Sequence, residues 1–186
     1  MTRNLVLFGM MGSGKTTVAR AVAQRLEREV VDTDDQIERR TGTTIADIVT
    51  SSGEAALRAH ERSAVARVTR RDDLVVSVGG GAVLDERNVE RLRASGVLIE
   101  LRAPVSVLAA RLASDTQRAT RPLLVAPDLV EAITSLATAR RASYEAAADH
   151  AVDADAAVDD IADAVIAWAS GEPGVLSAAE LARVAG

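Results

Sequence analysis

The residues with the clearest chemical meaning form an octapeptide near the start of the chain. Gly9-Met10-Met11-Gly12-Ser13-Gly14-Lys15-Thr16 has the spacing glycine, four residues, glycine, lysine, then serine or threonine. In this pattern backbone N–H groups surround phosphate oxygens, the lysine reaches the β- and γ-phosphates, and the hydroxyl is offered to Mg²⁺. We therefore expect a nucleoside triphosphate to bind through Gly12, Ser13, Gly14, Lys15, Thr16 and Thr17.

The lysine of this loop is the only lysine among the 22 lysine and arginine residues of the chain. A compact ammonium on a flexible stem differs from a guanidinium, so its use at this one position favours a phosphate contact. The alternative is a glycine turn with an incidental lysine. The flanks argue against it, because residues 4–8 read as a buried strand and residues 17–28 have apolar side chains at helical spacing.

Two further segments carry candidate groups at the ends of predicted strands. Asp32-Thr33-Asp34 places two carboxylates on the same side of an extended segment, where one could hold Mg²⁺ and the other could accept a proton from a substrate hydroxyl. The alternative is that one of them only caps the next helix. Ser77-Val78-Gly79-Gly80-Gly81 has more glycines than a tight turn needs, which indicates close approach to a ligand. The alternative there is a flexible turn.

Arginine side chains supply the candidate anion contacts. Arg58 lies between Glu54 and Glu61 on one helical stripe, so it is either a two-pronged carboxylate binder or part of a solvated salt-bridged face. Arg118 and Arg121 lie in a polar, proline-broken segment, about residues 114–127, which we expect to close over the phosphates as a lid; the alternative is ordinary surface arginine. His60 and His150 occur singly, which is more typical of structural than of catalytic histidines.

Composition excludes several other classes of protein. A net charge of -5 argues against a nucleic-acid face, and one Trp, one Tyr and one Phe leave no platform for stacked bases. The chain has no cysteine, so disulfides and thiolate sites are excluded, which fits a reducing cytoplasm. No apolar run is long enough for a membrane span, and we expect no signal peptide.

The elements that must position these groups alternate between strand and helix. Strands are expected near residues 4–8, 29–32, 74–78, 97–101 and 151–152, and helices near 17–28, 35–40, 44–50, 53–71, 85–94, 104–113, 129–148 and 156–170. This alternation predicts an α/β fold, a three-layer α/β/α domain with a five-stranded parallel sheet of P-loop NTPase type, over residues 1–170. We expect residues 171–186 to be a mobile tail.

Together these segments resemble the shikimate kinase family, a group of P-loop small-metabolite kinases related to nucleoside monophosphate kinases. The resemblance covers about residues 4 to 170 and rests on the phosphate loop, Asp32-Thr33-Asp34, Gly53-Glu54 with Arg58, Ser77-Val78-Gly79-Gly80-Gly81-Ala82-Val83, Arg121-Pro122-Leu123-Leu124 and Arg140 with Tyr144. It implies ATP-dependent, Mg²⁺-assisted phosphorylation of the 3-hydroxyl of shikimate, on the pathway to chorismate and aromatic amino acids. A cytoplasmic monomer without nucleic-acid or membrane partners is expected.

The resemblance also implies roles for individual residues. Lys15, Asp34 and Arg121 would act in catalysis, and Arg111 and Arg121 would join the phosphate loop in binding ATP. The shikimate contacts would come from Asp34, Arg58, Gly79, Gly80, Gly81 and Arg140, and the metal site from Thr16, Asp32 and Ser77.

The chain departs from the family pattern at two single positions and in one short segment. Leu57 and Val49 stand where the family often has Phe, and Arg140-Arg141-Ala142-Ser143-Tyr144 lacks the usual Pro-Leu, so the apolar wall of the substrate site is expected to be smaller. A kinase for another polyol acid or for a nucleotide is one alternative. A GTPase-like switch is another, but its Asn-Lys-x-Asp element needs a second lysine, which the chain lacks.

Overall fold

Five short apolar runs pair as an all-parallel sheet in the order β2-β3-β1-β4-β5. The strands are β1 (Asn4–Gly9), β2 (Glu29–Asp32), β3 (Leu74–Ser77), β4 (Gly96–Arg102) and β5 (His150–Asp153). They come from a computed structural model that describes residues 2–114 and 129–185. The three central strands are buried almost throughout, because helices cover both faces of the sheet.

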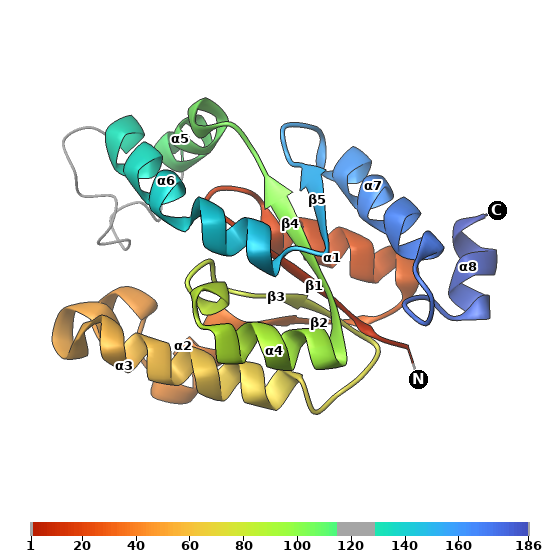
Figure 1. Ribbon diagram of the computed structural model, residues 1–186, viewed down its shortest axis with the longest axis horizontal. Coiled ribbons are helices and arrows are strands. Elements are labelled where there is room, and N and C mark those ends of the chain that lie inside the picture. The colour runs from red at the N-terminus through yellow and green to blue at the C-terminus, as the bar shows by residue number, and fades with distance from the viewer. Residues whose placement is uncertain (1, 115–128, 186) are drawn as a thin grey trace.

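The helices form the two outer layers (Figure 1). They are α1 (Lys15–Leu26), α2 (Thr33–Thr41), α3 (Ile45–Val68), the 3₁₀ helix η1 (Ala82–Leu84), α4 (Glu86–Ser95), α5 (Val105–Ser114), α6 (Leu129–Ala147), α7 (Val158–Gly171) and α8 (Ala178–Val184). One apolar core joins the sheet to α1 and α7, and a second joins it to α3, α4, α5 and α6. The predicted three-layer arrangement with a five-stranded parallel sheet is therefore confirmed.

Element boundaries differ from the prediction where backbone geometry decides them. The two helices predicted over residues 44–50 and 53–71 form one element, α3, interrupted at Gly53, whose φ of 79° is not helical. The η1 helix, which was not predicted, follows directly after the three glycines. Within the described residues, no helix is long and apolar enough to span a membrane.

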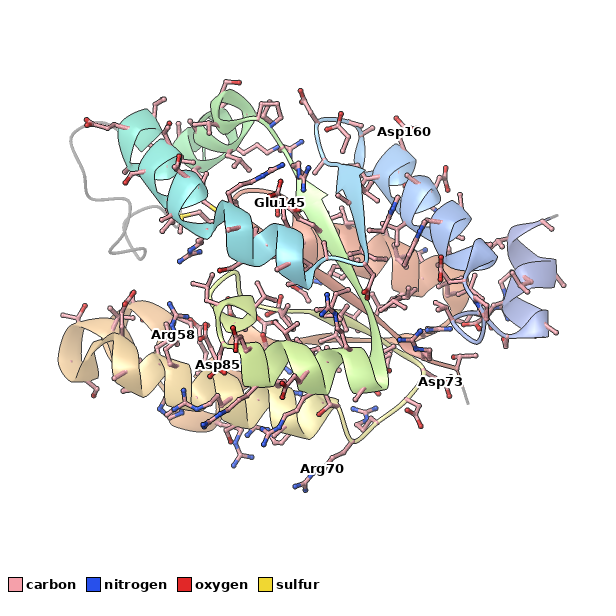
Figure 2. The ribbon with its side chains drawn as sticks, in the orientation of Figure 1. Arg58, Arg70, Asp73, Asp85, Glu145 and Asp160 are labelled. Carbon is pink, nitrogen blue, oxygen red and sulfur yellow. The ribbon has the colours of Figure 1, made fainter. Side chains whose placement is uncertain are left out.

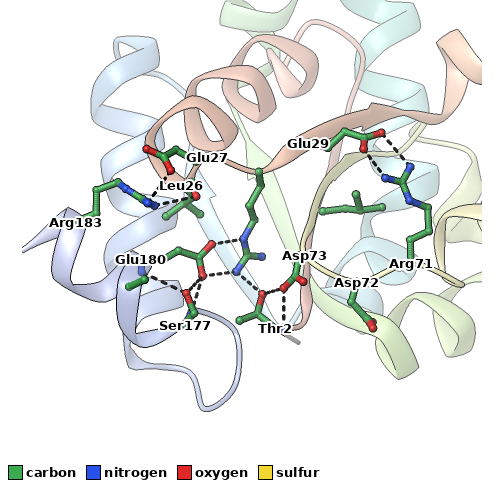
Figure 3. A pocket seen from close by; sticks show the side chains of 13 residues that line it. Thr2, Leu26, Glu27, Glu29, Arg71, Asp72, Asp73, Ser177, Glu180 and Arg183 are labelled. Atoms are coloured by element: carbon green, nitrogen blue, oxygen red, sulfur yellow. Dashed lines mark hydrogen bonds and ion pairs between the residues drawn. The ribbon is translucent and has the colours of Figure 1, made fainter.

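The segment after Gly171 differs from the expected mobile tail. Val175 and Leu176 are buried in the core shared with α1 and α7. Ser177 and Glu180 form a reciprocal capping box that starts α8. Glu180 also accepts a hydrogen bond of 2.6 Å from the Nε–H group of Arg28, which lies two residues after α1. Arg28, Ser177 and Glu180 all line the hollow drawn in Figure 3. Packing against α1 accounts for the helix, since seven residues would not hold a helix alone.

Candidate active site

The phosphate loop lies between β1 and α1, as predicted. Gly12 and Gly14 have φ angles of 80° and 85°, which favour glycine, and α1 begins at Lys15. The Lys15 ammonium donates to the carbonyl oxygens of Gly9 at 3.2 Å and Met10 at 3.0 Å. The Ser13 hydroxyl is buried and has no hydrogen-bond partner among the described residues. This arrangement of N–H groups, ammonium and hydroxyl suits a phosphate chain.

Asp32 uses its two carboxylate oxygens for different purposes. Oδ1 caps α2 by accepting the N–H groups of Asp34 at 2.9 Å and Asp35 at 3.3 Å. Oδ2 accepts the Thr16 hydroxyl at 2.7 Å, which ties the end of β2 to the phosphate loop. Buried Ser77 is the register partner of Asp32 in β3. Asp32 therefore caps the next helix, as the alternative proposed, and also contacts the phosphate loop, as the prediction of a site requires.

A hydroxyl and a carboxylate side by side are suitable oxygen ligands for Mg²⁺. The described residues include no group of three or more His, Cys, Asp or Glu that could hold a metal by themselves. Mg²⁺ usually keeps several waters and takes only one or two protein oxygens together with substrate phosphates, so Thr16 and Asp32 fit this ion.

Asp34 lies against the first of the three glycines. A Cβ on Gly79 would come within 2.5 Å of the Asp34 Oδ1 atom. Burial raises the pKa of Asp34 to about 6, and the neighbouring charge of Asp32 adds to this, while Lys15 opposes it. Near neutral pH this carboxylate is therefore mostly ionised and well matched to accept a proton.

The other two glycines also have side chains where a Cβ would lie. At Gly80 a Cβ would come within 2.6 Å of the Tyr144 hydroxyl and 3.3 Å of the Arg140 Nη1 atom. At Gly81 it would collide with the guanidinium of Arg58. The flexible-turn alternative does not explain these contacts, because neighbouring side chains fill the space that a Cβ would need at each glycine.

Arg58 and Arg140 reach the glycine segment from two different helices, α3 and α6. Arg58 comes from α3 and lies on the side of that helix that faces α6 in Figure 2. Its Nη1 atom donates to both carboxylate oxygens of Glu61, at 2.8 and 2.6 Å, and its Nη2 atom lies 3.8 Å from Glu54. Arg58 therefore forms the salt bridges that the alternative proposed. Its guanidinium nevertheless lies against Gly81 rather than on a solvated face of the helix.

Arg140 is only 8% exposed, and no carboxylate of the described residues lies within the 4.0 Å of a salt bridge. The Glu61 carboxyl, buried between the two arginines, has its pKa raised by burial, which the Arg58 bonds and the Arg140 charge only partly offset. Two guanidinium groups thus lie near one buried carboxylate, and of these two only Arg58 is bonded to it.

The remaining predicted residues are placed as follows. Arg111 of α5 donates to the carbonyl oxygens of Gly12 at 3.4 Å and Ala154 at 2.8 Å, so it lies beside the phosphate loop. Arg121 and the expected lid over residues 114–127 fall almost entirely outside the described residues. His150 stacks on Trp168 with ring centroids 4.8 Å apart, which agrees with a structural role.

The apolar residues that depart from the family pattern lie between α2 and α3. Leu57 belongs to a small buried cluster with Ile37, Ile48 and Ala64, and Val49 packs against it.

Sequence reasoning did not find the function of the single Tyr and single Phe. The rings of Phe8 and Tyr144 meet edge to face, with centroids 5.4 Å apart, and bring α6 onto β1. A signal was present, since Phe8 directly precedes the phosphate loop and Tyr144 follows Arg140 by four residues, one helical turn.

Comparison with known proteins agrees with this geometry. A family model described as shikimate kinase matches residues 11–170. The shikimate kinase of Pelotomaculum thermopropionicum is 42% identical over 151 residues, which is 81% of this chain and 86% of that protein. The shikimate kinase of Symbiobacterium thermophilum is 45% identical over 145 residues, 78% of this chain and 83% of that one.

A solved structure gives the same result. The shikimate kinase from Acinetobacter baumannii in complex with shikimate has a TM-score of 0.85 and 32% identity, over 90% of this chain and 93% of that one. The predicted P-loop kinase type of fold is therefore confirmed. The family match ends at residue 170, before α8 begins.

Proposed function

The chain belongs to the shikimate kinase family, and we propose that it transfers the γ-phosphoryl group of ATP to the 3-hydroxyl of shikimate, giving shikimate 3-phosphate and ADP. The observation that carries this proposal is the meeting of Asp34, Arg58 and Arg140 over the three glycines, next to the phosphate loop. Shikimate combines a carboxylate with neighbouring hydroxyls. Two guanidinium groups and one carboxylate complement that combination.

Phosphate binding is assigned to the loop from Gly12 to Thr17. Backbone N–H groups and the positive end of α1 hold the phosphate oxygens, and Lys15 leaves its two carbonyl partners to bind the β- and γ-phosphates. Arg111 is assigned to the neighbourhood of the adenine, and Arg121 to the closing segment. In this reaction class positioning and charge neutralisation supply most of the rate enhancement.

Asp34 acts as the general base in this proposal. One of its carboxylate oxygens accepts the proton of the 3-hydroxyl as the hydroxyl oxygen forms its bond to the γ-phosphorus. The bond between that phosphorus and the bridging oxygen breaks, and ADP leaves with the electron pair. Arg58 and Arg140 hold the shikimate carboxylate and hydroxyls, and the glycines let the substrate approach the backbone.

A magnesium ion is part of the proposal. Thr16 and Asp32 would hold it, with Ser77 close to Asp32, and it would neutralise charge on the phosphates. We also propose a monomer that works in the cytoplasm, which the absence of cysteine suits. Light scattering tests whether the protein is a monomer, and titration of the activity with Mg²⁺ tests whether the ion is required.

The decisive experiment is a coupled assay of ADP formation with and without shikimate. We expect turnover to depend on shikimate, and Arg140→Ala and Arg58→Lys to weaken shikimate binding by about 2 kcal/mol or more while the KM for ATP changes less than about twofold. Arg141→Ala is the matched control, because its side chain is half-exposed and pairs only with Glu145 among the described residues. Equal ADP formation without shikimate, or with gluconate in its place, would contradict the assignment.

A further inference from the structure

The hydroxyl of Tyr144 lies between the two glycine segments of the site. It donates to the carbonyl oxygen of Gly80 at 2.9 Å, and the carbonyl oxygen of Gly9 lies 3.4 Å away. Gly80 belongs to the segment assigned to shikimate, and Gly9 begins the phosphate loop. A phenol has one proton, so the shorter contact marks Gly80 as its main acceptor.

The same hydroxyl lies beside Arg140. Both side chains project from α6, one helical turn apart, and both approach the position that a Cβ on Gly80 would take, at 2.6 Å for the hydroxyl and 3.3 Å for the Arg140 Nη1 atom. The hydroxyl oxygen can accept an Arg140 N–H bond while its proton goes to the Gly80 carbonyl. Burial raises the pKa of Tyr144 and outweighs the charge and hydrogen bond of Arg140, so the phenol stays neutral and remains a donor.

Packing alone explains the ring of Tyr144 but not its hydroxyl. The ring is buried against Phe8, edge to face. A phenylalanine would make the same contact without placing a polar group in an apolar core. A buried hydroxyl is costly unless it is hydrogen-bonded, and here each of its neighbours belongs to the substrate or phosphate segments.

We propose that Tyr144 is a positioning residue for shikimate: its hydroxyl fixes the Gly80 peptide and orients the Arg140 guanidinium. Tyr144 itself touches neither reactant and acts through these two neighbours. The inference rests on the proposed function, because it assigns the site of Gly80 and Arg140 to shikimate.

Tyr144→Phe tests the hydroxyl while keeping the ring against Phe8. We expect the KM for shikimate to rise about tenfold, which corresponds to about 1.4 kcal/mol. The KM for ATP should change less than about twofold, since the contact to Gly9 is the longer one, and kcat should change less than about threefold. A purely structural role would lower the melting temperature without separating the two KM values.

Ile133→Val is the matched control for loosened packing. Ile133 lies on the same helix and in the same core as Tyr144, and is 1% exposed, but it is not part of the hydroxyl network. Its substitution should lower the melting temperature with an unchanged KM for shikimate. If Tyr144→Phe proves less stable, calorimetry measures its apparent association constant for shikimate. This constant is then divided by the fraction of folded protein, which circular dichroism measures. Wild-type affinity per folded molecule then overturns the inference.

A double-mutant cycle with Arg140→Ala tests whether the hydroxyl acts through the guanidinium. In the Arg140→Ala background, Tyr144→Phe should raise the KM for shikimate less than about threefold; a full additional tenfold rise would overturn the orienting role. Wild-type protein is assayed in parallel. Shikimate-dependent turnover with an unaffected Tyr144→Phe variant overturns this inference alone, whereas no shikimate-dependent turnover in wild type overturns the proposed function and the inference with it.

Discussion

The two ends of the parallel sheet treat charge in opposite ways. At the amino ends of the strands, opposite charges pair one to one. Arg28 pairs with Glu180. Arg71 pairs with Glu29, and Arg183 with Glu27 (Figure 3). At the carboxyl ends, like charges are neighbours. Asp34 lies near Asp32, and the charges of Arg58 and Arg140 both act on Glu61, to which only Arg58 of the two is bonded.

The carboxyl groups of the two ends respond to their surroundings with pKa shifts of opposite sign. Burial would raise the pKa of Glu180, but bonds from Arg28 and Ser177 prevail and lower it. Burial and Asp32 raise the pKa of Asp34 to about 6. Charge pairing therefore stabilises the amino end, whereas the Asp34 carboxylate at the carboxyl end is destabilised by burial and by a like charge, which is typical of functional sites.

The volume of a cavity does not distinguish the two ends of the sheet. The hollow at the amino end has a volume of about 570 Å³, yet the polar groups in it, such as Arg28, Glu180 and Arg71, already bind one another. Incomplete pairing of charge marks the site more clearly than the volume of a cavity.

The largest expected effect is on the rate at the carboxyl end. Lys15→Ala should lower kcat at least about a thousandfold, about 4 kcal/mol of barrier, because it removes a charge aimed at the transferring phosphoryl group. The melting temperature should stay nearly unchanged. Arg20→Ala, at an exposed position of the same helix, is the control and should keep full activity. Comparable kcat values for the two variants would remove the phosphate loop from the proposed mechanism.

The next largest effect is on stability at the amino end. Arg28→Met should lower the free energy of unfolding by about 3 kcal/mol, because Glu180 would remain buried without its partner, their side chains being 2% and 10% exposed. Urea denaturation measures this, and kcat of the folded enzyme should be unchanged. Adding Glu180→Gln should recover most of the loss; no recovery would mean that the pair matters for packing rather than charge.

A stability effect of up to similar size but opposite sign is expected from Asp34→Asn, measured without nucleotide and Mg²⁺. Because the native pKa of about 6 exceeds the ordinary 3.8, the native state binds more protons than the unfolded state between these values. The stabilising contribution of this group is complete below about pH 4 and is lost as the pH rises through about 6.

Asp34→Asn should therefore be more stable than wild type at pH 7, by up to about 3 kcal/mol, and nearly equal to it near pH 4, while phosphoryl transfer is lost. Denaturation at several pH values measures the gap. Asp35→Asn, one residue further along α2, is the control. A difference in stability that does not change between pH 4 and pH 7 would mean that burial does not destabilise the ionised carboxylate of Asp34.

The smallest effect is expected for the exposed pair at the amino end. Glu29→Gln should change the free energy of unfolding by less than about 0.5 kcal/mol, since the side chains of Glu29 and Arg71 are 57% and 50% exposed and water screens them. Urea denaturation at low and high salt is the measurement. A loss as large as that of Arg28→Met would show that pairing, not burial, sets the stability of this end.

Local patterns made the phosphate loop and the strand ends predictable. The spacing from Gly9 to Thr16 encodes a backbone shape within eight residues, and parallel strands necessarily bring their carboxyl ends to one edge. For that reason the sequence alone predicts that Asp34 and the three glycines lie at one edge of the sheet.

Contacts between distant residues could not be predicted in this way. Glu180 looks like a solvated residue of a weak helix, and only the fold places it against Arg28, 152 residues earlier. The two oxygens of Asp32, which serve a helix cap and Thr16 at once, looked like alternatives because sequence spacing cannot show that both bonds form together.

The single lysine has a consequence for chemical labelling. Apart from the chain's own amino terminus, Lys15 carries the one primary amine of the protein, and it lies against the carbonyl oxygens of Gly9 and Met10 inside the phosphate loop. An amine-directed acylating reagent can therefore add one side-chain adduct per molecule, and the mass of the intact protein counts it. Protection of that adduct by a bound nucleotide would report occupancy of the loop directly, without any turnover.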